Sequence, residues 1–190
     1  PEKPSRPFSQ RQLNKCLETG ADKFGWSKRA KPGASRDGRW LIGMGVAAAF
    51  RNNINGPSAA RVRLAKSGVV TVETDMTDIG TGTYTIIAQT AAEMMGVPLD
   101  RVVVKLGDSA FPVSGGQWGA NSSTAGVYAA CVKLREAVVQ KLGLASDAVF
   151  ADGEVKAGRR SVALGDAAAD GELVAEDNME YGDLAEKFQQ

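Results

Sequence analysis

The sequence predicts an α+β fold in which a small, mostly antiparallel sheet packs against two or three amphipathic helices. Short segments of β-branched or alternating character cover residues 43–50, 60–64 and 69–76, and turn-forming sequences separate them. A helical pattern, another strand and a longer helical pattern follow in that order. Because strands, helix, strand and helix do not alternate regularly, an α+β class fits better than a series of βαβ units.

The first 40 residues are expected to form a helix and a basic linker. Ser9 and Gln12 match a capping box, and apolar residues then recur at helical spacing, which predicts a helix over residues 10–24. Residues 25–39 are basic and contain proline and glycine, so they are expected to be a loop.

Residues 41–145 are expected to form the α+β core. The helix that follows Gly80 should end at Gly96, because glycine favours the left-handed conformation of a helix C-terminus. Residues 101–106 are predicted to be a buried strand, and the longest helix should end near Gly143. The third region, 146–190, is expected to hold a hairpin over 149–162 and an acidic segment without assigned structure.

Composition excludes several classes of function. The net charge of +1 argues against nucleic acid or an anionic membrane as a partner. No apolar run reaches the ~18 residues of a membrane-spanning helix. The absence of histidine excludes serine–histidine catalysis and ordinary zinc sites. Cys16 and Cys131 lie far apart in the sequence and are expected to pack as small hydrophobic residues of helices, although a disulfide between them stays possible.

Two glycine-rich loops, each followed by a helical pattern, are the candidate binding site. Glycine lets a backbone approach an anion, and the N-terminus of a helix offers N–H groups and a favourable dipole to a phosphate. The loops could hold the two ends of one large phosphorylated cofactor. The candidate cofactor-binding residues are Ile79, Gly80, Thr81, Gly82, Gly115, Gly116, Gln117, Trp118, Gly119, Asn121, Ser122 and Ser123.

Neither loop carries an established nucleotide motif. Both lack the Gly-Lys-Ser or Gly-Lys-Thr of a Walker loop, and Thr85 stands where a dinucleotide fingerprint has its third glycine. Ordinary turn chemistry is therefore an alternative interpretation of each loop. Trp118 could either contact a ligand or cover its own loop.

Several segments, in their order and spacing, resemble the molybdenum-cofactor-binding subunit of the xanthine dehydrogenase and aldehyde oxidase family. The similarity is greatest to the molybdenum subunits of bacterial periplasmic aldehyde oxidoreductases, and it covers nearly the whole chain. The matching segments are Arg39–Gly43 (RWLIG), Asp78–Thr85 (DIGTGTYT), Met95–Pro98 (MGVP), Gly107–Ser109 (GDS) and Gly115–Ser122 (GGQWGANS).

The resemblance implies a molybdenum hydroxylase of aldehydes or heteroaromatic compounds. In such enzymes a molybdopterin dinucleotide, of the cytosine form in the bacterial members, holds the molybdenum, and both glycine loops contact this cofactor. The resemblance also implies iron–sulfur and FAD partner subunits and a periplasmic location. The family has Gln where this chain has Thr81, which puts that side-chain contact in doubt but not the backbone contacts.

The family's general base, a glutamate in a late Gly-Glu motif, has no counterpart here. The Gly-Glu pairs at Gly153 and Gly171 lie in a predicted turn and in the acidic segment. No catalytic residue and no metal ligand is therefore assigned to this chain, which is expected to be an inactive piece of a larger molybdopterin-binding domain with no cofactor of its own. The alternative is a self-contained nucleotide-binding or interaction domain without catalytic activity.

Overall fold

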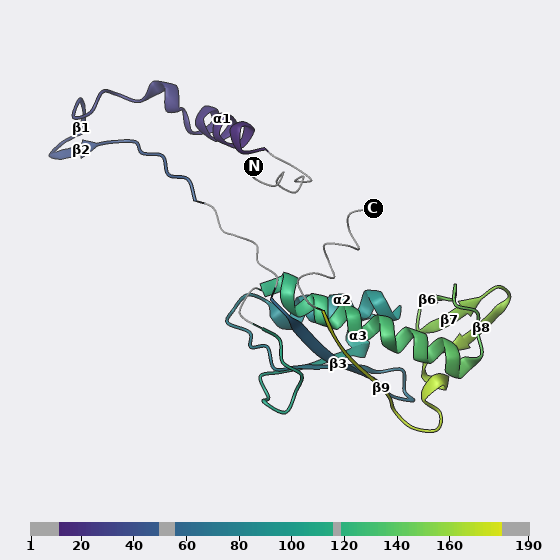
Figure 1. Ribbon diagram of the computed structural model, residues 1–190. Helices are drawn as coiled ribbons and strands as arrows, with labels where there is room; N and C mark the ends of the chain where they lie inside the picture. Colours follow the sequence, from purple (N-terminus) through teal and green to yellow (C-terminus); the bar gives the residue numbers. More distant parts are fainter. Residues whose placement is uncertain (1–11, 50–55, 116–118, 180–190) are drawn as a thin grey trace, which may run out of the picture. The chain divides into compact units, whose positions relative to one another are not determined.

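The computed structural model describes residues 12–49, 56–115 and 119–179, and the chain divides into two compact units, Pro1–Arg51 and Asn52–Gln190 (Figure 1). The three-part division expected from the sequence, 1–40, 41–145 and 146–190, stays a prediction. None of the helices in the described ranges is both long enough and apolar enough to cross a bilayer.

The first unit contains one helix and one small hairpin. Helix α1 (Leu13–Phe24) ends at Gly25, which has a left-handed φ of 78°, and the 3-10 turn η1 (Trp26–Lys28) follows. This confirms the predicted helix. Ser9 of the expected capping box lies outside the described residues, and Gln12 makes no side-chain capping hydrogen bond.

Strand β1 (Ser35–Asp37) pairs antiparallel with β2 (Trp40–Ile42). Residues 25–39 are therefore not wholly the loop that was expected, because a hairpin turn at Gly38 brings residues 35–37 beside a partner strand. The strand expected over residues 43–50 was wrong, because residues 43–49 form no regular structure and Phe50 lies outside the described ranges. Two glycines, Gly43 and Gly45, weaken this segment, and no strand pairs with it within residues 12–49. The amino-acid composition of residues 43–50 suggested a strand, but a strand forms only where a second strand pairs with it.

The second unit is built on a four-stranded sheet with the order β5-β4-β3-β9. Its strands are β3 (Ser58–Leu64), β4 (Val70–Thr74), β5 (Val102–Leu106) and β9 (Leu173–Met179). Strand β3 runs antiparallel to both β4 and β9, and β4 runs parallel to β5. The mostly antiparallel sheet is thus confirmed. Strand β9 comes from the acidic segment that the sequence left unassigned.

Helices α2 (Thr83–Met95) and α3 (Gly119–Leu142) pack side by side against the sheet (Figure 1). Along β3, Ala60, Val62 and Leu64 are fully buried, so they face this helical layer and form the centre of the core. The helices end at the glycines predicted from the sequence, Gly96 with a φ of 63° and Gly143 with a φ of 59°.

Strand β5 differs from the expectation of a buried strand. The 3-10 turn η2 (Leu99–Arg101) precedes it, and its residues alternate between half-buried and exposed, with Val103 44% exposed. The alternation arises because Val103 and Lys105 lie on the face of the sheet without helices, and the edge position, with β4 as the neighbouring strand, leaves the other residues of β5 half-buried. A run of valines was therefore a poor indicator of burial on both faces.

A second, three-stranded sheet contains β6 (Val149–Ala151), β7 (Glu154–Ala157) and β8 (Arg160–Ala163), followed by the 3-10 turn η3 (Leu164–Ala168). Asp152 and Gly153 both have positive φ, 58° and 74°, in the turn between β6 and β7. This confirms the predicted hairpin and its turn, since two positive φ values are what a two-residue hairpin loop of this kind requires.

Candidate functional site

Both glycine-rich loops begin at the same end of the four-stranded sheet. Strands β4 and β5 are parallel, and Thr74 at the end of β4 is in register with Leu106 at the end of β5. The segments leaving these two strands lead into α2 and α3. Ser58, the first residue of β3, forms a bridge with Ser114 at this end as well. In α/β arrangements ligands bind outside the carboxyl ends of parallel strands, and this end is therefore the candidate site.

The upstream loop is organised by Asp78. Its Oδ1 accepts hydrogen bonds from the backbone N–H of Gly80 at 2.8 Å and of Thr81 at 3.0 Å, and Oδ2 accepts one from Tyr84 at 3.4 Å. Desolvation opposes the charged form of Asp78, but hydrogen bonds from the backbone of Gly80, Tyr84 and Thr81 outweigh it and hold the pKa below its ordinary value. Two N–H groups that the sequence analysis offered to a phosphate therefore already serve this carboxylate.

Of the upstream candidates, Ile79, Gly80 and Thr81 are exposed, and Gly82 is half-buried. Gly80 and Gly82 have left-handed φ values of 93° and 79°, and a Cβ built on either would meet no atom within 4 Å. The Thr81 hydroxyl lies 3.2 Å from the hydroxyl of Thr83, and Ile79 is exposed. These glycines therefore serve the turn conformation, and the space beside them is open.

The downstream loop is fixed against the start of β3 and the end of β4. The backbone N–H of Gly115 donates to the carbonyl of Pro57 at 2.6 Å, and that of Ser114 donates to Asp75 Oδ1 at 2.6 Å. The hydroxyls of Ser114 and Ser58 lie 3.0 Å apart in a buried position. A Cβ on Gly115 would come within 2.7 Å of the Pro57 carbonyl oxygen, so close backbone contact requires glycine there.

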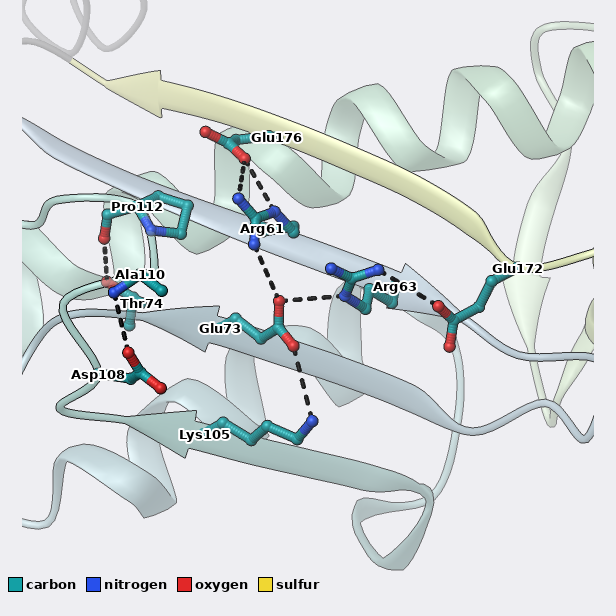
Figure 2. Close-up of polar contacts among 10 residues, drawn as sticks. All are labelled: Arg61, Arg63, Glu73, Thr74, Lys105, Asp108, Ala110, Pro112, Glu172 and Glu176. Atoms are coloured by element: carbon teal, nitrogen blue, oxygen red, sulfur yellow. Dashed lines mark hydrogen bonds and ion pairs between the residues drawn. The ribbon is translucent and has the colours of Figure 1, made fainter.

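A second set of contacts holds the same loop from the sheet side. The Thr74 hydroxyl donates to the carbonyls of Ala59 and Pro112, and Asp108 Oδ1 accepts the N–H of Ala110 at 2.9 Å (Figure 2). These supporting contacts were not predicted from the sequence. The polar residues at the ends of β4 and β5 could have indicated them, because such side chains commonly accept hydrogen bonds from loop N–H groups.

The hydroxyl-rich start of α3 is buried. Ser122 and Ser123 are almost inaccessible to solvent, and Ser122 Oγ accepts the backbone N–H of Gly56 at 2.9 Å. Gly119 begins the helix and Asn121 lies in its first turn. The candidates Gly116, Gln117 and Trp118 lie outside the described residues. The structure thus brings Gly115, Ser122 and Ser123 to the same end of the sheet as the upstream loop.

The electrostatics of this end of the sheet come from carboxylates and uncharged donors. Asp75, Asp78 and Asp108 each accept a loop N–H, and residues 74–84 and 107–126 contain no lysine or arginine. In the part of the chain that the structure describes, no three His, Cys, Asp or Glu side chains gather as a metal site. A ligand at this end would meet backbone N–H groups and hydroxyls of these two segments, and any positive charge would come from outside residues 74–84 and 107–126.

Basic side chains gather elsewhere, on the face of the sheet that α2 and α3 leave uncovered. Figure 2 shows Glu73 among Arg61, Arg63 and Lys105, at distances of 3.3, 3.0 and 3.6 Å, with Glu176 and Glu172 beyond the two arginines. Each cation is paired with a carboxylate, so this face stabilises the sheet and is not the candidate site.

Comparison with known proteins supports a common origin with molybdenum enzymes. The sequence model of the molybdopterin cofactor-binding domain family matches residues 19–188. The chain is 60% identical over 195 residues to the aldehyde oxidoreductase molybdenum-binding subunit PaoC of Escherichia coli K12, and 61% identical to that of strain O157:H7. These alignments cover the whole chain but 27% of either relative, so the chain spans about a quarter of their length.

A weaker sequence match and two solved structures of similar fold extend the comparison. A putative xanthine dehydrogenase molybdenum-binding subunit, XdhA of E. coli K12, is 30% identical over 134 residues, which cover 67% of this chain and 17% of that protein. Quinoline 2-oxidoreductase from Pseudomonas putida 86 superposes with a TM-score of 0.51 at 24% identity over 64% of this chain and 19% of its own. Reconstituted CO dehydrogenase from Oligotropha carboxidovorans gives 0.53 at 14% identity, over 89% and 24%.

Proposed function

The chain belongs to the family of molybdopterin cofactor-binding domains, and from this premise we propose that it supplies part of the cofactor site of an aldehyde-oxidising molybdenum hydroxylase. Identity to two aldehyde oxidoreductase subunits over the whole chain favours this function over a self-contained nucleotide-binding or interaction domain. Since the chain spans 27% of those subunits, the activity belongs to a longer subunit of which this chain is one portion.

The observation that carries the proposal is the meeting of both glycine loops at the carboxyl end of the β4–β5 pair. The residues present fit a large, polar cofactor. Open space lies beside Gly80 and Gly82, and hydrogen bonds to Asp75 and Pro57 position Ser114 and Gly115 at the start of the downstream loop. The residues proposed to hold the cofactor are the twelve candidates of the sequence analysis.

The chain's own residues bind and orient, and none of them is proposed to move a proton. When bound, the molybdenum cofactor supplies the redox chemistry of C–H hydroxylation. Backbone N–H groups at the start of α3 and the exposed face of the upstream loop would receive its polar groups, since helix N-termini favour anions. The absence of lysine and arginine from both loops implies that other segments of the subunit balance the negative charge of the phosphates.

The finer features of the proposed enzyme follow the family resemblance. The cofactor is proposed to be the molybdopterin cytosine dinucleotide, the substrate a small aldehyde or heteroaromatic compound, and the location the periplasm. Separate iron–sulfur and FAD subunits are proposed to carry electrons away from the molybdenum. The names of the E. coli relatives, which describe molybdenum-binding subunits, are consistent with such a division into subunits.

The proposal is tested in the full-length subunit by placing a bulky side chain at the start of α3. Gly119→Val and Gly116→Val should lower the molybdenum and cytidine nucleotide content of the purified protein, because a side chain there blocks the approach of a phosphate to the backbone. Gly20→Val, a helical glycine of α1 with no atom near its Cβ, is the control and should retain the cofactor. Unchanged cofactor content in folded Gly119→Val and Gly116→Val variants would contradict the proposed site.

A further inference from the structure

We propose that Asp78 is a positioning residue of the cofactor site, whose carboxylate acts as a built-in anion at the N-terminus of α2 and holds the loop Ile79–Gly82 in its binding conformation. The inference rests on the proposed function and deepens it. It concerns how the loop is held, and it assigns to the Gly80 and Thr81 backbone an indirect role in place of direct contact with a phosphate.

The geometry of the loop carries the first step. One carboxylate accepts three backbone N–H groups, those of Gly80, Thr81 and Tyr84, and therefore spans the loop and the first turn of the helix. The loop contains two left-handed residues, Gly80 and Gly82, which by themselves leave the chain many alternative conformations. Asp78 selects one of these conformations by fixing both sides of the turn.

Among the described residues, the N-terminus of α2 has no capping side chain other than Asp78. Its N-cap residue is Gly82, which has no side chain, and its first turn contains no acidic residue. The first N–H groups of a helix need acceptors and attract negative charge. Asp78 supplies both from four residues before the N-cap, and the same hydrogen bonds hold its pKa below the ordinary value against the cost of desolvation.

Only part of the upstream loop is accessible to an incoming cofactor. Because Gly80 and Thr81 donate to Asp78, their N–H groups face a carboxylate of their own chain. The loop then offers its other face, with the exposed Thr81 side chain and the open space beside the glycines, whereas Thr83 is buried and its hydroxyl pairs with that of Thr81. If Asp78 instead competed with the cofactor for these N–H groups, its removal would strengthen binding, and the two roles predict opposite results.

The test uses Asp78→Ala and Asp78→Asn in the full-length holoenzyme. Asp170→Ala is the matched control, because Asp170 is also an exposed carboxylate with a lowered pKa, paired with Lys141 beyond the opposite end of the sheet. Two readouts are independent of turnover: bound molybdenum and nucleotide after dialysis, and backbone hydrogen–deuterium exchange of a peptide covering residues 79–84. Circular dichroism verifies that each variant is folded.

We expect Asp78→Ala to lose the cofactor about tenfold faster than wild type and to exchange faster in the loop, since several charge-assisted hydrogen bonds disappear. Asp78→Asn keeps the shape and one acceptor and should lie between the two. Added formate should slow cofactor loss from Asp78→Ala, because the small carboxylate can occupy the vacated N–H groups. Asp170→Ala should behave as wild type in both readouts.

Three results would overturn the inference: wild-type cofactor retention and loop exchange in Asp78→Ala, tighter retention in that variant, or equal loss in Asp78→Ala and Asp78→Asn without any response to formate. Failure of the proposed function gives a different signature. A wild-type subunit without molybdopterin would refute the function, whereas the exchange of residues 79–84 would still report whether Asp78 holds the loop.

Discussion

Glu73 is the most highly connected side chain on the uncovered face of the sheet. It is 5% exposed, lies on β4, and interacts with Arg61 and Arg63 of β3 and Lys105 of β5 (Figure 2). Desolvation disfavours its charge, but hydrogen bonds and charge from Arg63, with further help from Arg61 and Lys105, outweigh that cost and lower its pKa. A single carboxylate thereby links the parallel pair to the antiparallel part of the sheet.

Replacing Glu73 should change both stability and its pH dependence. Glu73→Gln leaves the three cations without their shared carboxylate and should lower the free energy of unfolding by about 1–3 kcal/mol at pH 7. A lowered folded-state pKa gives stability that is present above the ordinary value of 4.5 and is lost as pH falls through the folded-state pKa. Thermal unfolding of the full-length subunit across this range should show a smaller acid loss in Glu73→Gln than in wild type, and parallel curves would contradict the assigned role.

Thr81 stands where the resembling family has glutamine, and its hydroxyl bonds to that of Thr83. Thr81→Val removes one hydrogen bond worth ~0.5–1.5 kcal/mol, so cofactor retention or activity should fall by about tenfold or less. Thr81→Gln should be tolerated. Complete loss of activity in Thr81→Val with the cofactor intact would show that this threonine has a catalytic role. The measurements are molybdenum content and aldehyde turnover of the full-length enzyme.

At the residue level the sequence identified the glycines of both loops but not the side chains that hold them. Gly80, Gly82 and Gly115 were recognisable because glycine has few reasons to precede a helix other than turn conformation or close approach. Asp75 and Ser58 were not recognisable, since their partner Ser114 is reached only after β3 and β4 pair and β5 returns beside them. Contacts over such separations depend on the topology of the sheet.

Among the helices, α3 approaches the sheet most closely at a glycine. A Cβ on Gly126 would lie 2.6 Å from the Ser58 carbonyl oxygen, so the helix backbone rests directly on the start of β3. Gly20 of α1 is also helical but has no atom within 4 Å of its Cβ position. Close packing against β3 therefore requires glycine at position 126, whereas no steric contact requires it at position 20.

Alanine at these two positions should give opposite effects. Gly20→Ala should stabilise by up to about 1 kcal/mol, because alanine is the better helix former. Gly126→Ala gains the same propensity but forces α3 away from β3, and the resulting overpacking, about 1–3 kcal/mol, should outweigh it. Urea unfolding of the full-length subunit, followed by helical circular dichroism, measures both. A stabilised Gly126→Ala variant would show that α3 can move without cost.

The elements themselves were largely predictable from periodicity and glycine signals, with exceptions that share one cause. Helices α1, α2 and α3 and the strands β3, β4 and β5 fall where the patterns placed them. The predicted strand at 43–50 was wrong and β9 was missed. In both cases, whether the segment forms a strand depends on whether another strand pairs with it. Strand β9 is rich in acidic residues but has seven partners along β3, while residues 43–49 have none among the described strands.

At the scale of the whole chain, burial is concentrated in one unit. Every buried hydrophobic side chain of the described residues belongs to the second unit, around β3, α2 and α3. Residues 12–49 bury none, and Trp40 and Val46 are among their exposed apolar side chains. Folded domains gain stability mainly from apolar burial. The two glycine-rich loops, which are proposed to bind the cofactor, therefore belong to the unit that has its own core.

This arrangement predicts that the 190-residue chain oxidises no aldehyde by itself. It holds the sheet end proposed to bind the cofactor, but no Gly-Glu segment corresponds to the family's general base, and general-base catalysis alone is worth ~10²- to 10⁴-fold in rate. The chain also spans 27% of the length of its E. coli relatives, so most of the contacts to a dinucleotide cofactor would come from other segments. Purified chain, supplied with molybdenum cofactor and an artificial electron acceptor, should give no turnover above a heat-treated sample. Measurable oxidation would show that this portion holds both the complete cofactor site and an unrecognised base.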